Sequence, residues 1–141
     1  MFYVYAKKAP IREFTDDYIR EKLQHFSDEE AWEMLKPLTL LGKKLGELNI
    51  NFEVPEDVNL LGIKKGETDL QRFFYWNICK MYFRPELSFE EMNLINFDWF
   101  RPLNCHRHTA EEIEKWCREV GLDIELKYVH NAGITIVGRK N

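Results

Sequence analysis

Residues 97–139 read FDWFRPLNCHRHTAEEIEKWCREVGLDIELKYVHNAGITIVGR and contain the clearest secondary-structure signals of the chain. Thr109, with a Glu three residues later, forms the capping-box pattern and predicts a helix over 109–120. Gly121 readily adopts the left-handed conformation that ends a helix. Alternating apolar residues then fill 124–129 and 134–139 on either side of an Asn-Ala-Gly turn, which predicts a β-hairpin.

The N-terminal segment predicts one more strand. Phe2 to Ala6 alternates aromatic and β-branched residues and is apolar on both faces, which is typical of an inner strand covered on both sides. Pro10 is predicted to end this strand. No hairpin partner follows nearby, so its neighbours in a sheet must come from elsewhere.

The residues between that strand and Thr109 are mainly helical in pattern. Capping-box patterns at Ser27, Thr68, Ser88 and Thr109 mark helix starts. The expected helices cover residues 15–26, a segment from 27 interrupted near Pro37, 38–48, 68–82 and 88–96. Residues 49–66 are expected to be irregular, with a short strand at 51–54.

Composition narrows the class of protein. The chain has 141 residues, 45% of them hydrophobic, so it can bury a core as one domain. Its net charge of -4 and the absence of a basic block argue against a nucleic-acid partner. There is no apolar run of membrane-spanning length and no signal-peptide pattern, so we expect a cytoplasmic protein with no membrane partner. The three cysteines are expected to be reduced thiols because none forms a CxxC pair.

By pattern alone, helices between one strand and a C-terminal hairpin give an α/β fragment that is α+β in appearance. The sequence also resembles the C-terminal half of class I S-adenosylmethionine-dependent methyltransferases. The resemblance rests on Asp-Trp-Phe-x-Pro at 98–102, His-Thr-x-Glu-Glu-x-x-x-Trp at 108–116 and the Gly-ended helix before the hairpin. Residues 2–12 and 69–76 are similar to segments of the same half.

The resemblance implies a particular sheet. Phe2 to Lys7 would correspond to the fifth strand, Ile124 to Val129 to the sixth and Ile134 to Arg139 to the seventh. The seventh strand is expected to lie antiparallel in the centre of this three-stranded mixed sheet. Five to six helices would be inserted between the first two strands in sequence. Residues 1–141 are thus expected to form one domain, with a helical substrate cap at about 27–100.

The cofactor half of such an enzyme has no counterpart in this sequence. Neither the Gly-rich first loop nor the acidic residue closing the second strand is present. S-adenosylmethionine is therefore the cofactor implied by the resemblance, but it is not expected to bind this chain alone. The outer edge of Phe2 to Lys7 would lack its neighbour, so we expect a missing N-terminal half or a second copy to fill it.

The resemblance also implies where an acceptor would bind, since the inserted helices cover it in related enzymes. The candidate acceptor contacts are Arg72, Tyr75, Trp76, Asp98, Trp99, Arg101 and His108, and His106 is the candidate general base. Asp98 to His108 are expected on a loop.

Each candidate also has a structural explanation. Arg72 could lie on a helix surface, Trp76 could be a core aromatic, and Asp98 could cap or brace the loop before Pro102. The pair His106 and His108 lacks a second well-spaced ligand pair, so no metal site is expected.

Two functions remain open from the sequence. The first is the acceptor-covering portion of a small-molecule methyltransferase, whether from a truncated gene, a fragment or one chain of a split enzyme. The second is a stand-alone small-molecule-binding or oligomerisation module derived from that fold. The sequence does not identify the acceptor.

Overall fold

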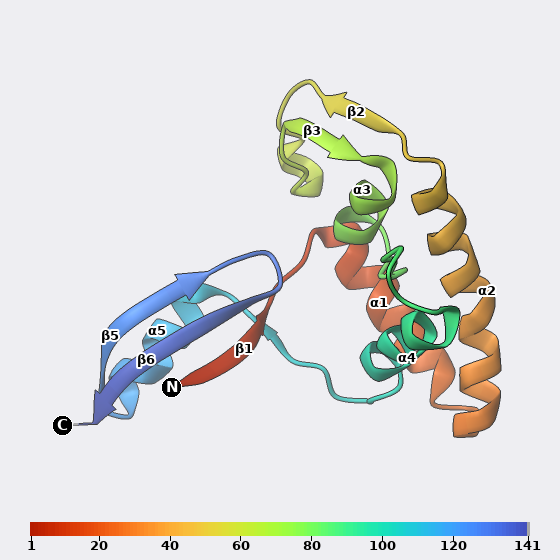
Figure 1. Cartoon of the computed structure of the whole chain (residues 1–141). Helices are drawn as coiled ribbons and strands as arrows, with labels where there is room; N and C mark the ends of the chain where they lie inside the picture. Colours follow the sequence, from red (N-terminus) through yellow and green to blue (C-terminus); the bar gives the residue numbers. More distant parts are fainter. Residues whose placement is uncertain (141) are drawn as a thin grey trace. The chain divides into compact units, whose positions relative to one another are not determined.

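A computed structural model describes residues 1–140 and divides the chain into two compact units. The sheet unit comprises residues 1–8 and the chain from Cys105 onward, and the helical unit comprises Ala9–Asn104. Within the described residues, five α-helices accompany a four-stranded mixed sheet and a two-stranded sheet (Figure 1). The chain therefore has the α/β composition that the sequence predicts. None of the helices in residues 1–140 has both the length and the apolarity to cross a membrane.

The sheet unit is built on four strands in the spatial order β4-β1-β6-β5. Their bounds are β1 (Phe2–Ala6), β4 (Arg107–His108), β5 (Leu122–Val129) and β6 (Gly133–Lys140). β6 runs antiparallel to both β1 and β5, whereas β4 runs parallel to β1. The sheet thus has one strand, β4, more than the three that the sequence predicts.

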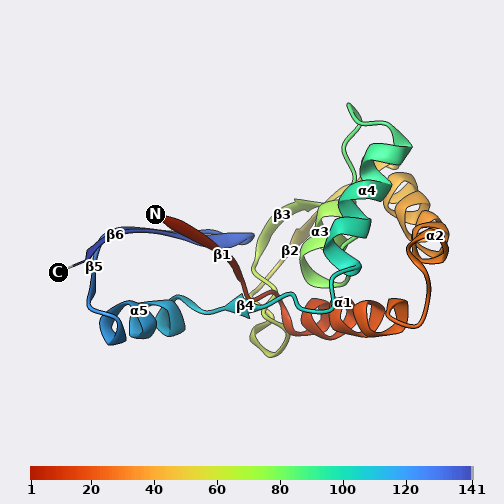
Figure 2. The same cartoon turned by 90° about the horizontal axis from the view of Figure 1, so that it is seen from below.

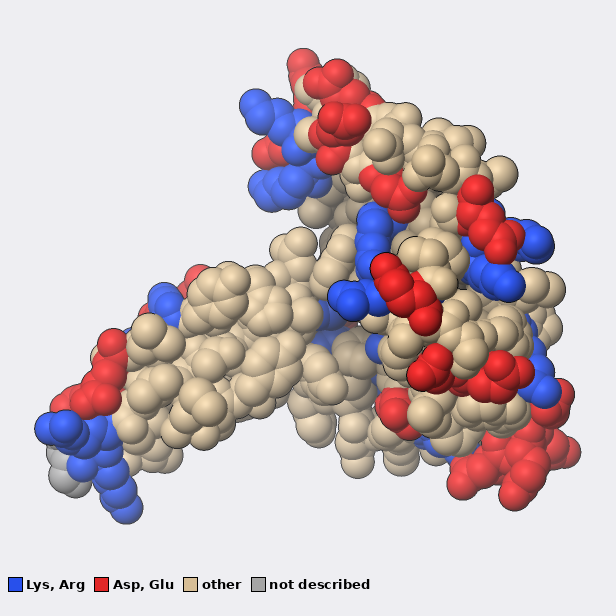
Figure 3. All heavy atoms as spheres, viewed as in Figure 1, with Lys and Arg blue, Asp and Glu red and all other residues tan. Residues whose placement is uncertain are grey.

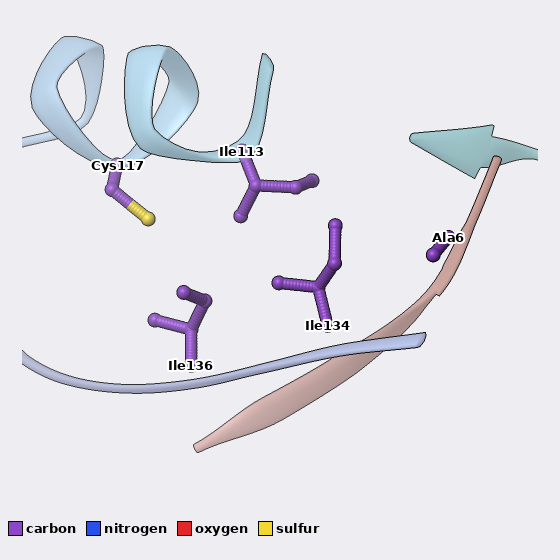
Figure 4. Packing of buried hydrophobic residues seen from close by; sticks show 5 residues of the cluster. All are labelled: Ala6, Ile113, Cys117, Ile134 and Ile136. Carbon is purple, nitrogen blue, oxygen red and sulfur yellow. The ribbon is translucent and has the colours of Figure 1, made fainter. Parts of the chain in front are cut away.

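One face of this sheet is covered by helix α5 (Ala110–Glu119), as Figure 2 shows. The predicted capping box is confirmed, because the Thr109 side chain accepts from the Glu112 amide and the Glu112 side chain accepts from the Thr109 amide. Residues one turn apart on α5 point at β6 in Figure 4. The buried cluster consists of Ala6, Ile113, Cys117, Ile134 and Ile136. Burying each isoleucine contributes roughly 1.5–3 kcal/mol and fixes α5 on the sheet.

The other face of the sheet carries aromatic side chains. Tyr3 pairs with Thr135, which pairs with Tyr128, so these residues share one face. Tyr3 remains 48% exposed and Tyr5 45% exposed. The expectation that β1 is covered on both faces is therefore wrong in this structure, because α5 covers one face only. In Figure 3 most of this open face is tan, and charged side chains gather at its left-hand end.

The outer edge of β1 is partly occupied by the chain itself. Tyr5 pairs with Arg107 and Ala6 with His108, and the Lys7 amide donates to the His108 carbonyl. The expectation of an edge that wholly lacks a neighbour is therefore wrong. Within the described residues, β-pairing on this edge reaches Tyr5, so only the first part of β1 can accept a further strand.

The helical unit contains four helices and a small hairpin. Their bounds are α1 (Pro10–Leu23), α2 (Asp28–Glu47), α3 (Leu70–Asn77), α4 (Phe89–Phe100), β2 (Asn51–Val54) and β3 (Gly66–Asp69). A short 3-10 helix, η1 (Asn59–Leu61), lies between the two strands of the hairpin. The predicted capping boxes at Ser27 and Ser88 are confirmed, as is the strand at 51–54.

Two proline positions differ from the expectation. Pro10 begins α1 instead of only ending the preceding strand, because proline at the first helical position has no amide that the helix would need. Pro37 lies inside α2 without dividing it into two helices. The buried stripe of Ala31, Leu35 and Thr39 continues across the proline, so tertiary packing holds the helix together.

The bounds of α3 and α4 also differ from the expectation, and the difference matters for the site. α3 starts from Asp69, whose side chain accepts from the Arg72 amide, and not from Thr68. It ends at Asn77, five residues before the expected end at Tyr82. α4 continues to Phe100, so residues expected on a loop are helical.

Candidate functional site

The most unusual feature of the helical unit is a row of buried charges on α1. Arg12, Asp16 and Arg20 follow one another at intervals of four residues and so lie on one face of the helix. Arg12 is 1% exposed, Asp16 0% and Arg20 3%. Charged side chains are rarely buried to this degree unless they are paired, so their partners define the candidate site.

Asp16 is the acceptor that joins three segments. Its Oδ2 atom accepts from Arg12 Nε at 3.1 Å and from Trp99 Nε1 at 2.9 Å. Its Oδ1 atom accepts from the Lys80 backbone amide at 3.2 Å. One carboxylate therefore holds α1, α4 and the segment after α3 together.

Three aromatic rings surround the Arg12 guanidinium. Its central carbon lies 4.6 Å from the ring centroid of Tyr75, 5.6 Å from that of Trp76 and 5.7 Å from that of Trp99. Arginine is favoured over aromatic faces because the ring quadrupole attracts the delocalised cation. We call these five residues, Arg12, Asp16, Tyr75, Trp76 and Trp99, the arginine–aromatic cluster.

The hydrogen bonding of Arg12 is incomplete. Its Nε donates to Asp16, but its Nη1 atom is buried and has no hydrogen-bond partner among residues 1–140. A buried donor without an acceptor costs about 1–3 kcal/mol. The Nη1 N–H group of Arg12 can therefore donate a hydrogen bond to a ligand in an environment of low dielectric constant.

Further cations lie close to the same rings. Arg20 and Lys80 lie 5.5 and 4.8 Å from the ring of Trp99, and Arg72 lies 5.4 Å from the ring of Tyr75. Arg20 is fixed by Asp17 at 2.8 Å and by the Trp99 carbonyl at 2.9 Å. Positive charge is thus concentrated here, although the chain as a whole has a net charge of -4.

The titration of neighbouring groups reflects this burial. Burial raises the pKa of the Tyr75 phenol, and the positive charges of Arg12 and Arg72 oppose that rise. Burial, together with the negative charge of Asp16, raises the pKa of the Cys79 thiol to about 12. Both groups are therefore protonated at neutral pH, so Tyr75 can donate a hydrogen bond and Cys79 is not a nucleophile.

The structure brings four of the predicted site residues together. Tyr75 and Trp76 come from α3 and Trp99 from α4, and Arg72 lies beside Tyr75. Trp99 is 7% exposed, whereas Tyr75 and Trp76 are only partly buried. Their role in acceptor binding stays a prediction.

Two other predicted residues lie away from this cluster. Asp98 is exposed on α4. Arg101 follows α4 directly and donates to the carbonyls of Leu23 and Phe26 at 2.9 and 3.2 Å, and it also pairs with Asp28. Arg101 therefore satisfies the carbonyls at the end of α1, a structural role. The expectation that Asp98 and Arg101 lie on a loop is wrong for Asp98, because the helical pattern continues to Phe100.

The two histidines belong to the sheet unit. His106 is exposed, and its ring lies 6.4 Å from that of His108. His108 ends β4, with its ring 4.7 Å from that of Trp116 and its Nδ1 3.8 Å from Glu112. Packing against α5 explains the position of His108, and the exposed His106 ring stacks on that of His108. Residues 1–140 contain no group of three potential metal-binding side chains.

Four residues of this site, Arg12, Asp16, Arg20 and Lys80, were not predicted from the sequence. The available signal was the spacing of Arg12, Asp16 and Arg20 by four, which is typical of salt bridges on an exposed helix surface. Only tertiary packing shows that this face is buried.

Comparisons with known proteins give no further guidance, because no family model, no curated protein and no solved structure matches the chain.

Proposed function

We propose that this chain is the acceptor-covering portion of an S-adenosylmethionine-dependent methyltransferase that acts on a small molecule. The observation that carries the proposal is the arrangement of the sheet unit. β6 lies between β1 and β5 and is antiparallel to both, and α5 precedes β5 and covers one face. This arrangement supports the resemblance to the last three strands of class I methyltransferases.

The position of the helical unit in the sequence supports the same proposal. The chain leaves β1, forms the helices of Ala9–Asn104 and returns to the sheet as β4. In the related enzymes, helices inserted at this point cover the acceptor. The arginine–aromatic cluster, with Arg72 at its side, is the place in this unit where polar and aromatic groups converge.

The described residues do not fit the cofactor itself. The connection from β1 to α1 is Lys7-Lys8-Ala9-Pro10, without a glycine that would let the backbone approach a ligand closely. The α1 N-cap, Ala9, makes no side-chain cap. We therefore assign S-adenosylmethionine to a partner: a missing N-terminal half, or a second copy joined through the free part of the β1 edge.

The contribution of this chain would be to bind and orient the acceptor. Transfer of an already activated methyl group depends chiefly on how the acceptor is aligned with the methyl carbon. Aromatic side chains and a fixed cation that hold the acceptor in place are therefore sufficient. We keep His106 as the candidate proton acceptor, because it is exposed. If His106→Ala leaves turnover of the assembled enzyme unchanged, this role is wrong.

The proposal is tested by assembling the enzyme. The chain is co-purified with the product of any neighbouring reading frame that is found to encode a strand followed by a Gly-rich loop. Methyl transfer from labelled S-adenosylmethionine to a small-molecule extract is then measured for each half and for the mixture. Activity in the mixture alone supports the proposal, and an associated but inactive pair contradicts it.

A stand-alone binding module is the second candidate. The observation that favours it is that the arginine–aromatic cluster is complete within the helical unit, since all its residues lie in 9–104. Such a module would bind its ligand without any cofactor-binding partner. The two candidates differ in whether ligand affinity changes when a cofactor half is added.

A further inference from the structure

We propose that the arginine–aromatic cluster binds the carboxylate of a small aromatic acid, with Arg12 and Tyr75 as the anchoring donors. The inference rests on the proposed function in one respect, namely that the acid would be the methyl acceptor. The binding itself requires neither cofactor nor catalysis.

The first argument is the unused donor on Arg12. Its Nη1 is buried and has no partner among the described residues, although Nε is satisfied by Asp16. Buried donors in native proteins almost always have an acceptor. A ligand oxygen at Nη1 would supply one and form a charge-assisted hydrogen bond, which is the stronger kind.

The second argument is the sign of the local charge. Arg12, Arg72 and Lys80 all place their cationic groups within 6 Å of the ring of Tyr75 or Trp99. Asp16 is buried and already accepts three hydrogen bonds. A cationic ligand is disfavoured because Arg12 itself occupies the space over the rings, so the cluster favours an anion.

The third argument distinguishes a carboxylate from a phosphate. The donors that we assign to the ligand are the unpartnered Nη1 of Arg12 and the Tyr75 hydroxyl beside it, whose pKa is raised by burial. These two donors suit the two oxygens of a carboxylate. A phosphate dianion has three acceptor oxygens and is usually held by several amides or a free arginine fork, which these donors do not provide.

The aromatic walls define the rest of the ligand. The rings of Tyr75 and Trp76 are perpendicular, with centroids 4.9 Å apart, and both are only partly buried. A planar ring can stack on one and meet the edge of the other, which is the geometry that aromatic pairs prefer. Both rings are partly exposed, so a ligand ring can contact them from solvent.

The test is titration of the isotope-labelled full chain with benzoate, followed by the NMR signals of the tryptophan indole N–H groups. Benzamide, which has the same shape without the charge, is titrated in parallel. We expect benzoate to shift the Trp99 and Trp76 signals saturably, and benzamide to bind at least about tenfold more weakly.

Two variants and a control locate the site. Arg12→Lys keeps the charge but loses the planar fork and should weaken benzoate binding about tenfold or more. Tyr75→Phe keeps the ring, is expected to remain folded and should weaken binding severalfold. Arg118→Gln, at an exposed position on α5, should bind as the unchanged chain does.

The proposal is overturned if the folded chain shows no saturable shift, if benzamide binds equally well, or if Tyr75→Phe binds with unchanged affinity. Because no cofactor is present in this titration, its failure is distinct from failure of the methyltransferase proposal. Saturable benzoate binding with no methyl transfer by the assembled pair would uphold the carboxylate site and reject the acceptor role.

Discussion

Replacing Asp16 with Asn should destabilise the helical unit severely. The substitution keeps the shape of the side chain but removes the charge that compensates Arg12, and both residues are at most 1% exposed. Breaking a buried ion pair by removing one partner typically costs about 3–5 kcal/mol. The Asn oxygen can still accept from the Lys80 amide, but its amide nitrogen would face the Arg12 and Trp99 donors, so we expect a loss within this range, about 3–5 kcal/mol.

The loss can be measured by urea unfolding followed by tryptophan fluorescence. Trp32, Trp76 and Trp99 lie in the helical unit, so the signal mainly reports on that unit. For a unit of this size, the thermal midpoint should fall by more than about 10 °C. Asp98→Asn, an exposed change on α4, is the matched control and should leave the midpoint unaltered.

A double variant separates the lost ion pair from a general packing defect. Arg12→Met with Asp16→Leu removes both charges and should be much less destabilised than the sum of the two single changes, since neither charge is left buried alone. A cost below about 1 kcal/mol for Asp16→Asn would refute the view that this carboxylate is the buried counter-ion of Arg12.

Three further predictions concern packing, reactivity and pH. Gly42→Ala should lower the free energy of unfolding in urea by about 1–3 kcal/mol, although alanine has the better helix propensity, because the added carbon would lie 2.7 Å from the Met81 carbonyl oxygen. A gain in stability would contradict this close packing. At pH 8, a thiol reagent should modify the partly buried Cys105 quickly and Cys79 only after unfolding, since burial raises the Cys79 pKa to about 12; rapid labelling of both would contradict its burial. The Thr109 backbone amide at the start of α5 donates to the Glu112 carboxylate and lowers its pKa. The ionised carboxylate therefore stabilises α5 above pH 4.5, and this stabilisation is lost as the pH falls through the lowered pKa. Glu112→Gln should flatten the pH dependence of amide exchange in α5, and an unchanged pH profile would contradict this role.

The parts of the fold that could be predicted are those encoded by short local patterns. The boxes at Ser27, Ser88 and Thr109 place two side-chain oxygens three residues apart, where they accept from backbone amides, and each box begins a helix. The hairpin turn at 131–133 could be recognised because it contains a glycine between two alternating segments. Gly133 has a further role, since a side chain there would clash with the Tyr3 ring.

The parts that could not be predicted depend on tertiary contacts. β3 reads Gly-Glu-Thr-Asp, which has no apolar alternation, and it forms because β2 offers it hydrogen-bond partners. β4 has only two residues and depends on β1 in the same way. Pro37 is tolerated because packing on both sides of it holds α2.

In the candidate site, too, some features could be predicted from the sequence and others depend on tertiary contacts. The rings of Tyr75, Trp76 and Trp99 could be selected from the sequence as candidates, but their convergence on Arg12 could not. An arginine and an aspartate four residues apart normally form an exposed pair on a helix. Their burial follows from the path of α4, which carries Trp99 to within 2.9 Å of Asp16.

The most direct test of the central claim is calorimetric titration of S-adenosylmethionine into the purified chain, alone and together with its cofactor half, with the mass determined by light scattering in the same buffer. We expect no binding by the folded chain alone and binding once the other half is added. Micromolar binding by the chain alone would contradict the account, because it would place a cofactor site within these residues.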